Sequence, residues 1–480
     1  MKNFSEFKKR VEEMVSANAD AHKNPYSRNV STKNESAEEI KEIIDSGNYG
    51  NIIQLSEKFL ASSGLYSRAI SYFSSLITCD VLTSVKKVGT KSISEKNYQK
   101  DFKGAVYFAD TVMNPRLNYP QFLYRVLAYG AYYGLLLELG DKATVKVLPN
   151  EFCRTRNKNF SNINILEFDM GYFDRYTSET ERKEALKRFP KDFTKGYNAY
   201  LNDRQNSQWY TVEDDVGIAF YYNSPNRPLF LPMLVAIANL NEYIDIEKSL
   251  DKQVLEKLII QQIPTDKDGN FILDDSEASA LHNGVVQMLR GNNFLDVLTT
   301  FADIKVENLG DRTKNEKDNL EKVERSVYNE AGLSPNLFGG SGATTTKLSV
   351  DTDVSLVFKI IEQLDNWLTY HVNRKFAKNS QYFFEVNTLP ITHYNRRDIL
   401  SDYLKLAEYG YNKTLPAVAS GMKQSAFLDM VEMENDFMHL HEKMIPLKSS
   451  HTMANDAGGA PEKPLDEKAD QTIKNQEVNS

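Results

Sequence analysis

Hydrophobic positions recur at intervals of three and four over much of the chain, which is the spacing of amphipathic helices. The first segments of this kind cover residues 3–17, 36–47, 52–60 and 65–76, and an apolar strand or helix follows near Val81. The chain is therefore expected to begin as a series of short helices.

The pattern becomes mixed in the next hundred residues. Helical spacing covers residues 117–140, but hydrophobic and polar residues then alternate over 143–147 and 163–168, as they do in half-buried strands. A helical stretch at 181–203 and a strand at 218–222 follow. The first half of the chain is therefore expected to combine helices with strands.

Long helices dominate the second half. Apolar positions repeat almost without a break from residue 228 to 262, which predicts a helix of roughly 50 Å. A strongly charged helix at 313–331 and a third long helix at 350–377 follow, separated by a polar stretch rich in Gly, Ser and Thr that is expected to be a loop. A turn, a short helix at 276–290 and an apolar run at 294–306 separate the first two long helices.

The C-terminal region carries further helical patterns over residues 380–447. Beyond residue 449 almost nothing is apolar, so the tail is expected to be disordered. The whole pattern predicts an α+β fold that is predominantly helical.

Composition excludes several classes of protein. The formal net charge of -8 does not suit a protein that grips nucleic acid over its whole surface. Two cysteines cannot build a disulfide scaffold or a Cys-rich zinc site, and no apolar stretch reaches the roughly 20 residues of a membrane span. Tyr 26 and Phe 25 against Trp 2 suit half-wet surfaces such as subunit interfaces.

None of the motifs expected of an enzyme is complete. His439 and His441 are two residues apart and so lie on different faces of a helix, which prevents both from binding one metal ion. Asp268-Gly269 is typical of a hairpin turn rather than of a calcium loop. The run from Gly339 to Lys347 lacks the order of a phosphate-binding loop. We therefore expect no catalytic residues, no metal and no cofactor.

The charged helix leaves two interpretations open. Lys314, Lys317, Lys322 and Arg325 could contact phosphate groups. They alternate with acidic residues, however, which is also the pattern of a solvated helix supported by pairs at i and i+4.

The order of the elements resembles that of the portal proteins of tailed bacteriophages. Three segments carry the resemblance: GLYSRAISYF at 64–73, LPNEFCR at 148–154 followed by the strand that ends at Asp169, and AGLSPNLFG at 331–339. The first is similar to the entry of the portal core, the second to the body sheet, and the third to the turn that closes the second stem helix.

The resemblance implies an elongated subunit in a ring, usually of twelve copies, at one vertex of a capsid. It divides the chain into an N-terminal wing (1–228), a first stem helix (229–255), a clip (256–312), a second stem helix (313–332), a tunnel loop with the long wing helix (333–384), a wing and crown region (385–448) and the tail (449–480).

Three sets of residues receive roles from the resemblance. The candidate DNA-channel charges are Lys314, Lys317, Lys322, Arg325 and Lys347. The candidate tunnel loop contains Gly339, Gly340, Ser341, Gly342, Thr344, Thr345 and Thr346. The candidate clip contains Asp268, Gly269, Val297, Phe301, Ile304 and Val306, with the strand at 297–306 available for pairing across subunits.

The implied partners are those of a portal: other copies of the chain, double-stranded DNA passing through the channel, the terminase motor, the major capsid and scaffolding proteins, and head-tail adaptor proteins. The implied location is the virion, after assembly in the host cytoplasm, with no membrane contact. Two other classes stay open, namely another ring-forming head-tail adaptor or virion structural protein, and a metal-dependent nuclease. The nuclease would need a converging acidic or His cluster, which the sequence does not reveal.

Overall fold

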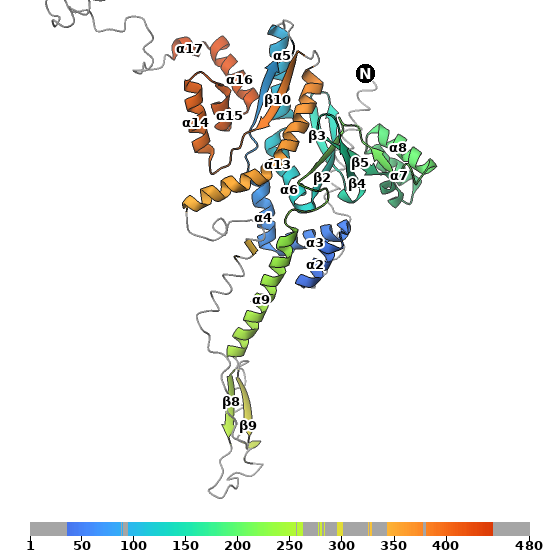
Figure 1. Ribbon diagram of the computed structural model, residues 1–480, viewed down its shortest axis with the longest axis vertical. Coiled ribbons are helices and arrows are strands. Elements are labelled where there is room, and N and C mark those ends of the chain that lie inside the picture. The colour runs from blue at the N-terminus through green and yellow to red at the C-terminus, as the bar shows by residue number, and fades with distance from the viewer. Residues whose placement is uncertain are drawn as a thin grey trace, which may run out of the picture. The chain divides into compact units, whose positions relative to one another are not determined.

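The computed structural model describes residues 36–87, 89, 95–255, 257–262, 295–300, 343–377 and 381–444, with the separate positions 277, 279, 280, 283, 325, 327 and 328. The chain forms two compact units, residues 1–425 and 426–480. In the first unit, helices and strands alternate irregularly along the chain, as expected for an α+β fold (Figure 1). The predicted helix at 3–17 and the predicted disordered tail from 449 lie outside the described residues.

The first half of the first unit contains the elements that build its two cores. They are α2 (Ala37–Asp45), α3 (Tyr49–Ser62), α4 (Gly64–Ser75), β1 (Val81–Lys87), α5 (Glu95–Tyr107), α6 (Pro115–Tyr129), β2 (Ala131–Leu139), β3 (Lys142–Val147), β4 (Cys153–Lys158), β5 (Asn164–Asp169), α7 (Glu179–Lys187), α8 (Lys191–Asn202), β6 (Trp209–Thr211) and β7 (Gly217–Tyr221). Two sheets have the strand orders β3-β2-β7 and β4-β5-β6, and all of their pairs are antiparallel.

The second half contains α9 (Leu231–Leu255), β8 (Lys257–Gln262), β9 (Leu295–Thr300), α13 (Ala343–Phe376), β10 (Tyr382–Thr388), α14 (Arg396–Glu408) and α15 (Thr414–Ala419). Helix α16 (Gln424–Glu432) begins in the first unit and continues into the second. The described part of the second unit consists of the rest of α16, a π-helical stretch at Met433–Phe437 and the short helix α17 (Leu440–Lys443).

Local sequence explains where the first helices begin. Ser36 and Glu39 form a capping box at α2, because Glu39 N donates to Ser36 Oγ (3.3 Å) and Ser36 N donates to Glu39 Oε2 (3.0 Å). Asn48 and Ser63 cap α3 and α4 in the same way with their side-chain oxygens. These short helices were predicted correctly from their spacing.

The predicted helix at 117–140 is wrong in its second half, since α6 ends at Tyr129 and β2 begins at Ala131. Gly130 has a φ of 78° and a Cβ there would clash with the backbone of Arg227, so only glycine fits this turn. Strand β2 is buried on both faces, with Tyr132 in one core and Tyr133 in the other. A strand covered on both sides does not alternate, and its apolar run imitated a helix.

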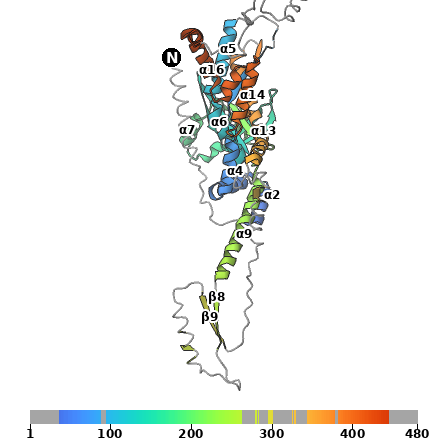
Figure 2. The ribbon, with the colours of Figure 1, turned by 90° about the vertical axis from the view of Figure 1, so that its left-hand side faces the viewer.

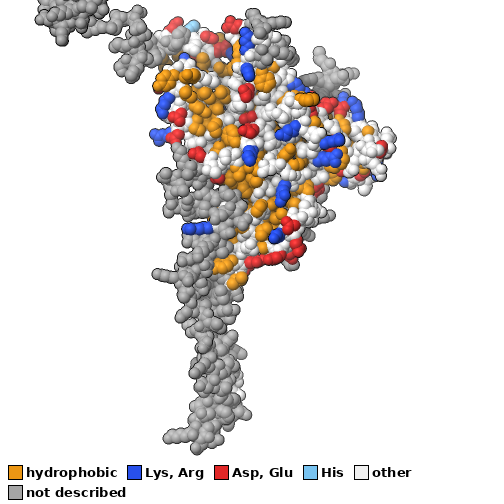
Figure 3. Space-filling model, viewed as in Figure 1, with side chains coloured by type: hydrophobic (Ala, Val, Ile, Leu, Met, Phe, Trp, Pro, Cys, Tyr) orange, Lys and Arg blue, Asp and Glu red, His pale blue; other side chains and the backbone are white. Residues whose placement is uncertain are grey.

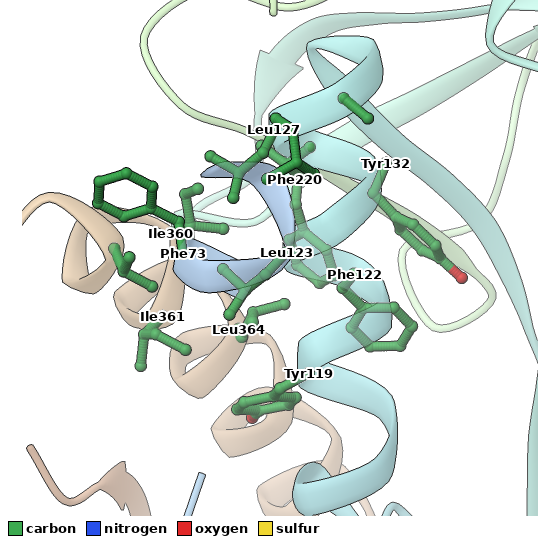
Figure 4. Close-up of a cluster of buried hydrophobic side chains, with 14 of the residues drawn as sticks. Phe73, Tyr119, Phe122, Leu123, Leu127, Tyr132, Phe220, Ile360, Ile361 and Leu364 are labelled. Carbon is green, nitrogen blue, oxygen red and sulfur yellow. The ribbon is translucent and has the colours of Figure 1, made fainter. Parts of the chain in front are cut away.

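The larger core lies where α4, α6, β2, β7 and α13 meet. Figure 4 shows Phe73 of α4, Tyr119 and Phe122 of α6, and the α13 side chains converging on one apolar interior. The Phe122 ring lies 4.4 Å from the ring of Tyr132, measured between centroids, and the two rings are tilted by 43°. Strand β2 presents Tyr132 to this interior. The opposite face of β2 joins a second, aromatic core with β5, α7 and α8, centred on Phe168, Phe173, Phe189 and Phe193. Strand β2 therefore separates the two cores.

Strands β1 and β10 form a two-stranded antiparallel sheet that joins residues 300 positions apart in the chain, with Val81 opposite Thr388. Two strands alone are only marginally stable in water. The region 380–447 was predicted to carry more helices, so β10 is a correction, whereas α14 to α17 confirm the remaining helical patterns. Phe383 and Glu385 on β10 are exposed while Tyr382, Phe384 and Val386 are buried, as the alternation of a half-buried strand requires.

Side chains of α13 close the free edge of this sheet. Asp365 Oδ2 accepts from Thr388 N (2.7 Å), Thr369 Oγ1 accepts from Val386 N (3.0 Å), and Asn373 Oδ1 accepts from Phe384 N (2.9 Å). Four helix residues rise about 6 Å and two strand residues span about 6.8 Å, so the two ladders match over these three hydrogen bonds.

At the other edge of the sheet, one glutamine side chain forms hydrogen bonds with the backbone of β1. Gln424 is buried and accepts from Thr83 N (2.7 Å) while its amide donates to Thr83 O (3.0 Å). Helix side chains therefore take the place of a third strand on both sides of the pair, which protects its backbone from pairing with other chains.

Helices α14 and α15 add a third and much smaller core. Its buried residues are Leu82, Leu389, Ile391, Val418 and Ala419, and no residue of α14 is fully buried. Tyr394, Leu404 and Tyr409 are exposed here, and Figure 3 shows hydrophobic side chains gathered on the face near α14. This part of the first unit leaves apolar surface in contact with solvent.

Candidate stem and clip segments

Helix α9 occupies the segment that the resemblance assigns to the first stem helix. Its first two turns are buried in the larger core, with Met233 and Leu234 fully covered. Helix α2 packs beside these turns (Figures 1 and 2). From Asn239 onward every side chain that the structure describes on α9 is exposed or half-buried, and Ile246 is 59% exposed.

The second half of α9 carries apolar side chains that the described residues cover only in part. Leu240, Tyr243 and Ile244 are half-buried, and Asp245 forms a surface pair with Lys248 at 3.3 Å. An exposed pair of this kind adds little stability. The described residues therefore leave part of this helix surface open to solvent.

The helix predicted to continue to residue 262 ends at Leu255 instead, and β8 begins at Lys257. Strand β8 pairs in parallel with β9, with Ile259 opposite Val297. The aliphatic run 258–260 is compatible with either a helix or a strand. It forms a strand because it pairs with β9. Tertiary pairing thus overrides a continuous helical period.

Only one candidate clip residue, Val297 on β9, lies in a described element. Asp268, Gly269, Phe301, Ile304 and Val306 lie outside the described residues. A hairpin turn joins antiparallel strands, and the parallel arrangement of β8 and β9 requires a crossover. The predicted turn at Asp268-Gly269 therefore does not connect these two strands directly.

The second stem helix is described at three positions, Arg325, Val327 and Tyr328, all of which are helical. Val327 is buried in the larger core, whereas Arg325 is exposed. Lys314, Lys317 and Lys322 lie outside the described residues. Of the candidate channel charges on this helix, the structure therefore places only Arg325, on the solvent side.

The candidate tunnel loop is shorter than predicted. Helix α13 begins at Ala343, so Thr344, Thr345, Thr346 and Lys347 belong to its first turns rather than to a loop that lasts to residue 349. Threonine is a weak helix former, but a helix whose later turns pack in a core can extend through such residues. Gly339, Gly340, Ser341 and Gly342 lie outside the described residues.

Polar contacts fix α13 to the elements around it. Near its start, Tyr72 Oη of α4 donates to Asp353 Oδ2 (2.9 Å). In its middle, Gln363 Nε2 donates to Tyr221 O of β7 (2.7 Å) and Asn366 Nδ2 donates to Ser161 O (2.8 Å). These contacts span three successive regions of the first unit, so α13 acts as the brace between them.

Near its end, α13 binds the β3-β2-β7 sheet and the loop before β7 through charges. Lys375 and Arg374 pair with Glu138 at 3.3 and 3.5 Å, and Arg374 also pairs with Asp215. These side chains are about one-third exposed, which limits the stability that each pair adds.

Two carboxyl groups on α13 have unusual environments. Burial raises the pKa of Asp365 to about 7, although hydrogen bonds from Thr388 and Tyr119 oppose the shift. Burial likewise raises the pKa of Asp353 to about 6, opposed by the hydrogen bond from Tyr72. Desolvation is thus the dominant cause in both cases.

One histidine of α13 is buried without a hydrogen bond. His371 is 1% exposed and packs against Trp367 with ring centroids 4.7 Å apart. Burial, with a smaller contribution from Arg374 and Lys375, lowers its pKa to about 3. Neither nitrogen has a protein partner, so the ring is a neutral core residue.

Sequence reasoning missed the polar residues of α13 that bind β10. Asp365, Thr369 and Asn373 follow one another at intervals of four, the repeat of one helix face. This repeat was a possible signal, but an ordinary solvated stripe has the same spacing.

The structure offers no centre for metal chemistry in the part of the chain that it describes, where no three His, Cys, Asp or Glu side chains are grouped to hold an ion. His439 has a left-handed backbone and precedes α17, which begins at Leu440. Cys79 and Cys153 are buried free thiols. Among the described helices, none combines the length and the apolar composition needed to cross a bilayer.

No protein-family model matches the sequence, and no curated protein is similar to it in sequence. Two solved structures are similar in part. A chain from the neck of an empty GTA particle shares 10% identity at a TM-score of 0.38, over 78% of this chain and 93% of that one. A chain from the virion of a native gene transfer agent particle shares 11% at 0.37, over 86% and 99%. Likenesses at this level do not establish a common fold.

Proposed function

We propose that this chain is the subunit of a phage portal: a ring at the capsid vertex through which double-stranded DNA is packaged and ejected. In this role it binds the terminase motor first and the neck or tail proteins afterwards. It acts as a structural channel, while the ATPase of the motor is a separate protein.

The observation that carries the proposal is the burial along α9. Helix α9 leaves the larger core, none of its described side chains after Ala238 is fully buried, and β8 follows the helix almost directly. The 34-residue helix α13 then crosses the first unit. Helices with a partly uncovered apolar stripe are stabilised by neighbouring copies in symmetric rings.

The two-stranded sheet β8-β9 supports the same proposal. Parallel sheets are normally covered on both faces, and a pair of strands is marginal by itself. Leu258, Ile259, Ile260, Val297 and Leu298 make both strands apolar. In a clip, a neighbouring copy or a docked adaptor protein would contact these two strands.

The charge of the chain suits a channel through which DNA slides better than a site that binds DNA tightly. Each phosphate neutralised by Lys or Arg adds affinity and salt dependence, so a channel that lets DNA slide carries few positive groups. A subunit with a net charge of -8 and a small set of basic residues in the lumen meets this condition. The proposed set is Lys314, Lys317, Lys322, Arg325 and Lys347.

Electron microscopy of the purified protein in negative stain tests the proposal directly. We expect rings with a central hole, and a mass measurement that gives about twelve subunits, the number that the portal resemblance implies. A compact monomer that cleaves DNA in a metal-dependent manner would contradict the portal and favour the nuclease.

The channel assignment has its own test. Changing the five basic residues to Gln in combination should alter packaging or retention of DNA while rings of normal mass still form. Normal packaging by such rings would overturn the assignment of these residues to the lumen and leave the ring itself untouched.

A further inference from the structure

The turn between β4 and β5 presents a fully exposed aromatic ring. Phe160 has a relative exposure of 112%, the largest among the exposed hydrophobic side chains of the described residues. A phenyl ring left in water is costly, and its burial at an interface contributes about 1.5–3 kcal/mol. An isolated exposed apolar residue is common, so its surroundings decide whether it has a role.

The turn around Phe160 is held in one conformation by its own backbone. Asn159 N donates to Ile163 O (2.9 Å), and Asn159 Oδ1 accepts from Ser161 N (2.9 Å) and Ile163 N (3.0 Å). Asn162 has a left-handed φ of 60°, which asparagine tolerates.

Two outside contacts fix the turn to the rest of the first unit. Asn366 of α13 donates to Ser161 O (2.8 Å), and Asn159 Nδ2 donates to Asp214 Oδ2 (2.9 Å). A turn whose backbone is already ordered loses little conformational entropy when it binds, which favours it as the support of an interface anchor.

Positive charge accompanies this anchor. Strand β4 carries Arg154, Arg156 and Lys158 and no acidic residue. Glu167, which is nearly buried, pairs with Arg154 at 2.6 Å and with Arg156 only at 3.8 Å. Asp214, which accepts from Asn159, is a second carboxylate at the turn. Three cations against two carboxylates leave the approach to Phe160 with a net positive charge, in a chain that is acidic as a whole.

The second unit contains a surface with the opposite charge. Residues 429–438 hold the carboxylates Asp429, Glu432, Glu434 and Asp436 and contain no Lys or Arg. The same segment exposes four large apolar side chains, which are Met430, Met433, Phe437 and Met438. Methionine adapts its shape to a partner and makes favourable contacts with aromatic rings.

We propose that the β4-β5 turn of one copy docks on residues 429–438 of a second copy, with Phe160 among the methionines and Arg156 and Lys158 beside the carboxylates. Charge and apolarity match on both sides, as expected of partners that must overcome the repulsion between two acidic chains. A methionine-lined acidic surface suits Phe160 and the two cations together, whereas the phosphates of DNA would suit only the cations.

The proposed contact joins two different surfaces, so it is heterologous, and a contact of this kind builds a ring when its repeated rotation closes. The inference therefore rests on the proposed function and deepens it, because it names which described surfaces meet between neighbouring subunits.

Charge reversal tests the pairing. We expect the double variant Arg156→Glu with Lys158→Glu to require about 10-fold more protein for assembly, as measured by mass photometry at low salt. The double variant Glu434→Lys with Asp436→Lys should have a similar defect. The four changes together should restore assembly, because the opposite charges again face each other. Circular dichroism of each variant checks that it is folded.

Disulfide trapping tests the position of the anchor. Protein with Phe160→Cys is mixed with protein carrying Phe437→Cys and oxidised, and we expect a covalent dimer that requires both variants. Leu117→Cys, at a 59% exposed site on α6, replaces Phe160→Cys in the control. Cys79 and Cys153 are buried and remain in all variants.

Three outcomes separate the two proposals. Rings that form equally well in all charge variants, or reversal without rescue, would overturn the docking contact and leave the portal in place. A covalent dimer that does not form from Phe160→Cys and Phe437→Cys, or that forms equally well with Leu117→Cys, would also overturn it. A wild-type protein that stays monomeric at every concentration would contradict the ring, and therefore both proposals.

Discussion

Helices α9 and α13 are both long, at 25 and 34 residues, and both carry an apolar stripe, but their surroundings differ. In α13 the stripe from Val357 to Val372 is buried inside the first unit. In α9 the last fully buried side chain among those described is that of Ala238.

The same periodic pattern can therefore lead to burial within one chain or to burial by a neighbouring chain. For α13 the cover comes from the same chain, so its side chains contribute to the stability of the monomer. For α9 the cover of the second half is proposed to come from neighbouring copies, so its side chains should contribute to assembly instead. The two helices can therefore be separated by experiment.

The largest effect is expected in the centre of α13. Trp367→Ala removes a side chain that is 1% exposed and packs against Phe220 and His371, so the free energy of unfolding should fall by about 3–5 kcal/mol. Urea unfolding of the monomer measures it. A loss below about 1 kcal/mol would mean that α13 is not the core helix described.

The next effect depends on pH. The folded pKa of Asp365 is about 7, above its ordinary value of 3.8. The contribution of the protonated carboxyl to the free energy of unfolding is therefore fully present below pH 3.8 and is lost as the pH rises through 7. Asp365→Asn removes this titration and should be more stable than the wild type by up to about 4 kcal/mol at pH 8.

The comparison of the two proteins at several pH values isolates the effect. At pH 5 the advantage of Asp365→Asn should be smaller than at pH 8, since the native carboxyl is still protonated there. An advantage that does not change with pH would show that desolvation of Asp365 is not its cause. Asp365→Ala is the control that removes the hydrogen bonds with Thr388 as well.

A smaller effect is expected where α13 closes the edge of β10. Asn373 accepts from Phe384 N (2.9 Å) and donates to Phe384 O (2.6 Å), so Asn373→Ala leaves two backbone groups without a partner and should cost about 2 kcal/mol. Hydrogen exchange should accelerate at the Phe384 amide first. Unchanged exchange there would contradict the role of α13 as a substitute strand.

The smallest effect on monomer stability is expected in α9. Ile246→Ala changes a side chain that is 59% exposed, so the monomer should keep its unfolding free energy within about 0.5 kcal/mol. Assembly into rings should nevertheless weaken, which sedimentation over a concentration series would detect. A variant that assembles normally would remove Ile246 from the proposed interface.

Sequence patterns predicted the short helices between residues 36 and 76 and the strands at 143–147 and 163–168, where β3 and β5 lie. They failed at β2 and β8, where a strand has an apolar run that a helix would also have. Of the candidate site, Arg325 is placed on a helix and Val297 on a strand, whereas Lys347 lies in α13 instead of a loop.

The sequence by itself determined the mixed, mainly helical character of the chain, its acidic charge and the existence of two long amphipathic helices. The tertiary structure was needed to show that β10 pairs with β1 across about 300 residues and that Asp365 is buried beside Thr388. It was also needed to show that no described side chain of α9 after Ala238 is fully buried. The reason is physical: periodicity reports which face of an element avoids water, whereas pairing and desolvation depend on the distant segment that covers that face.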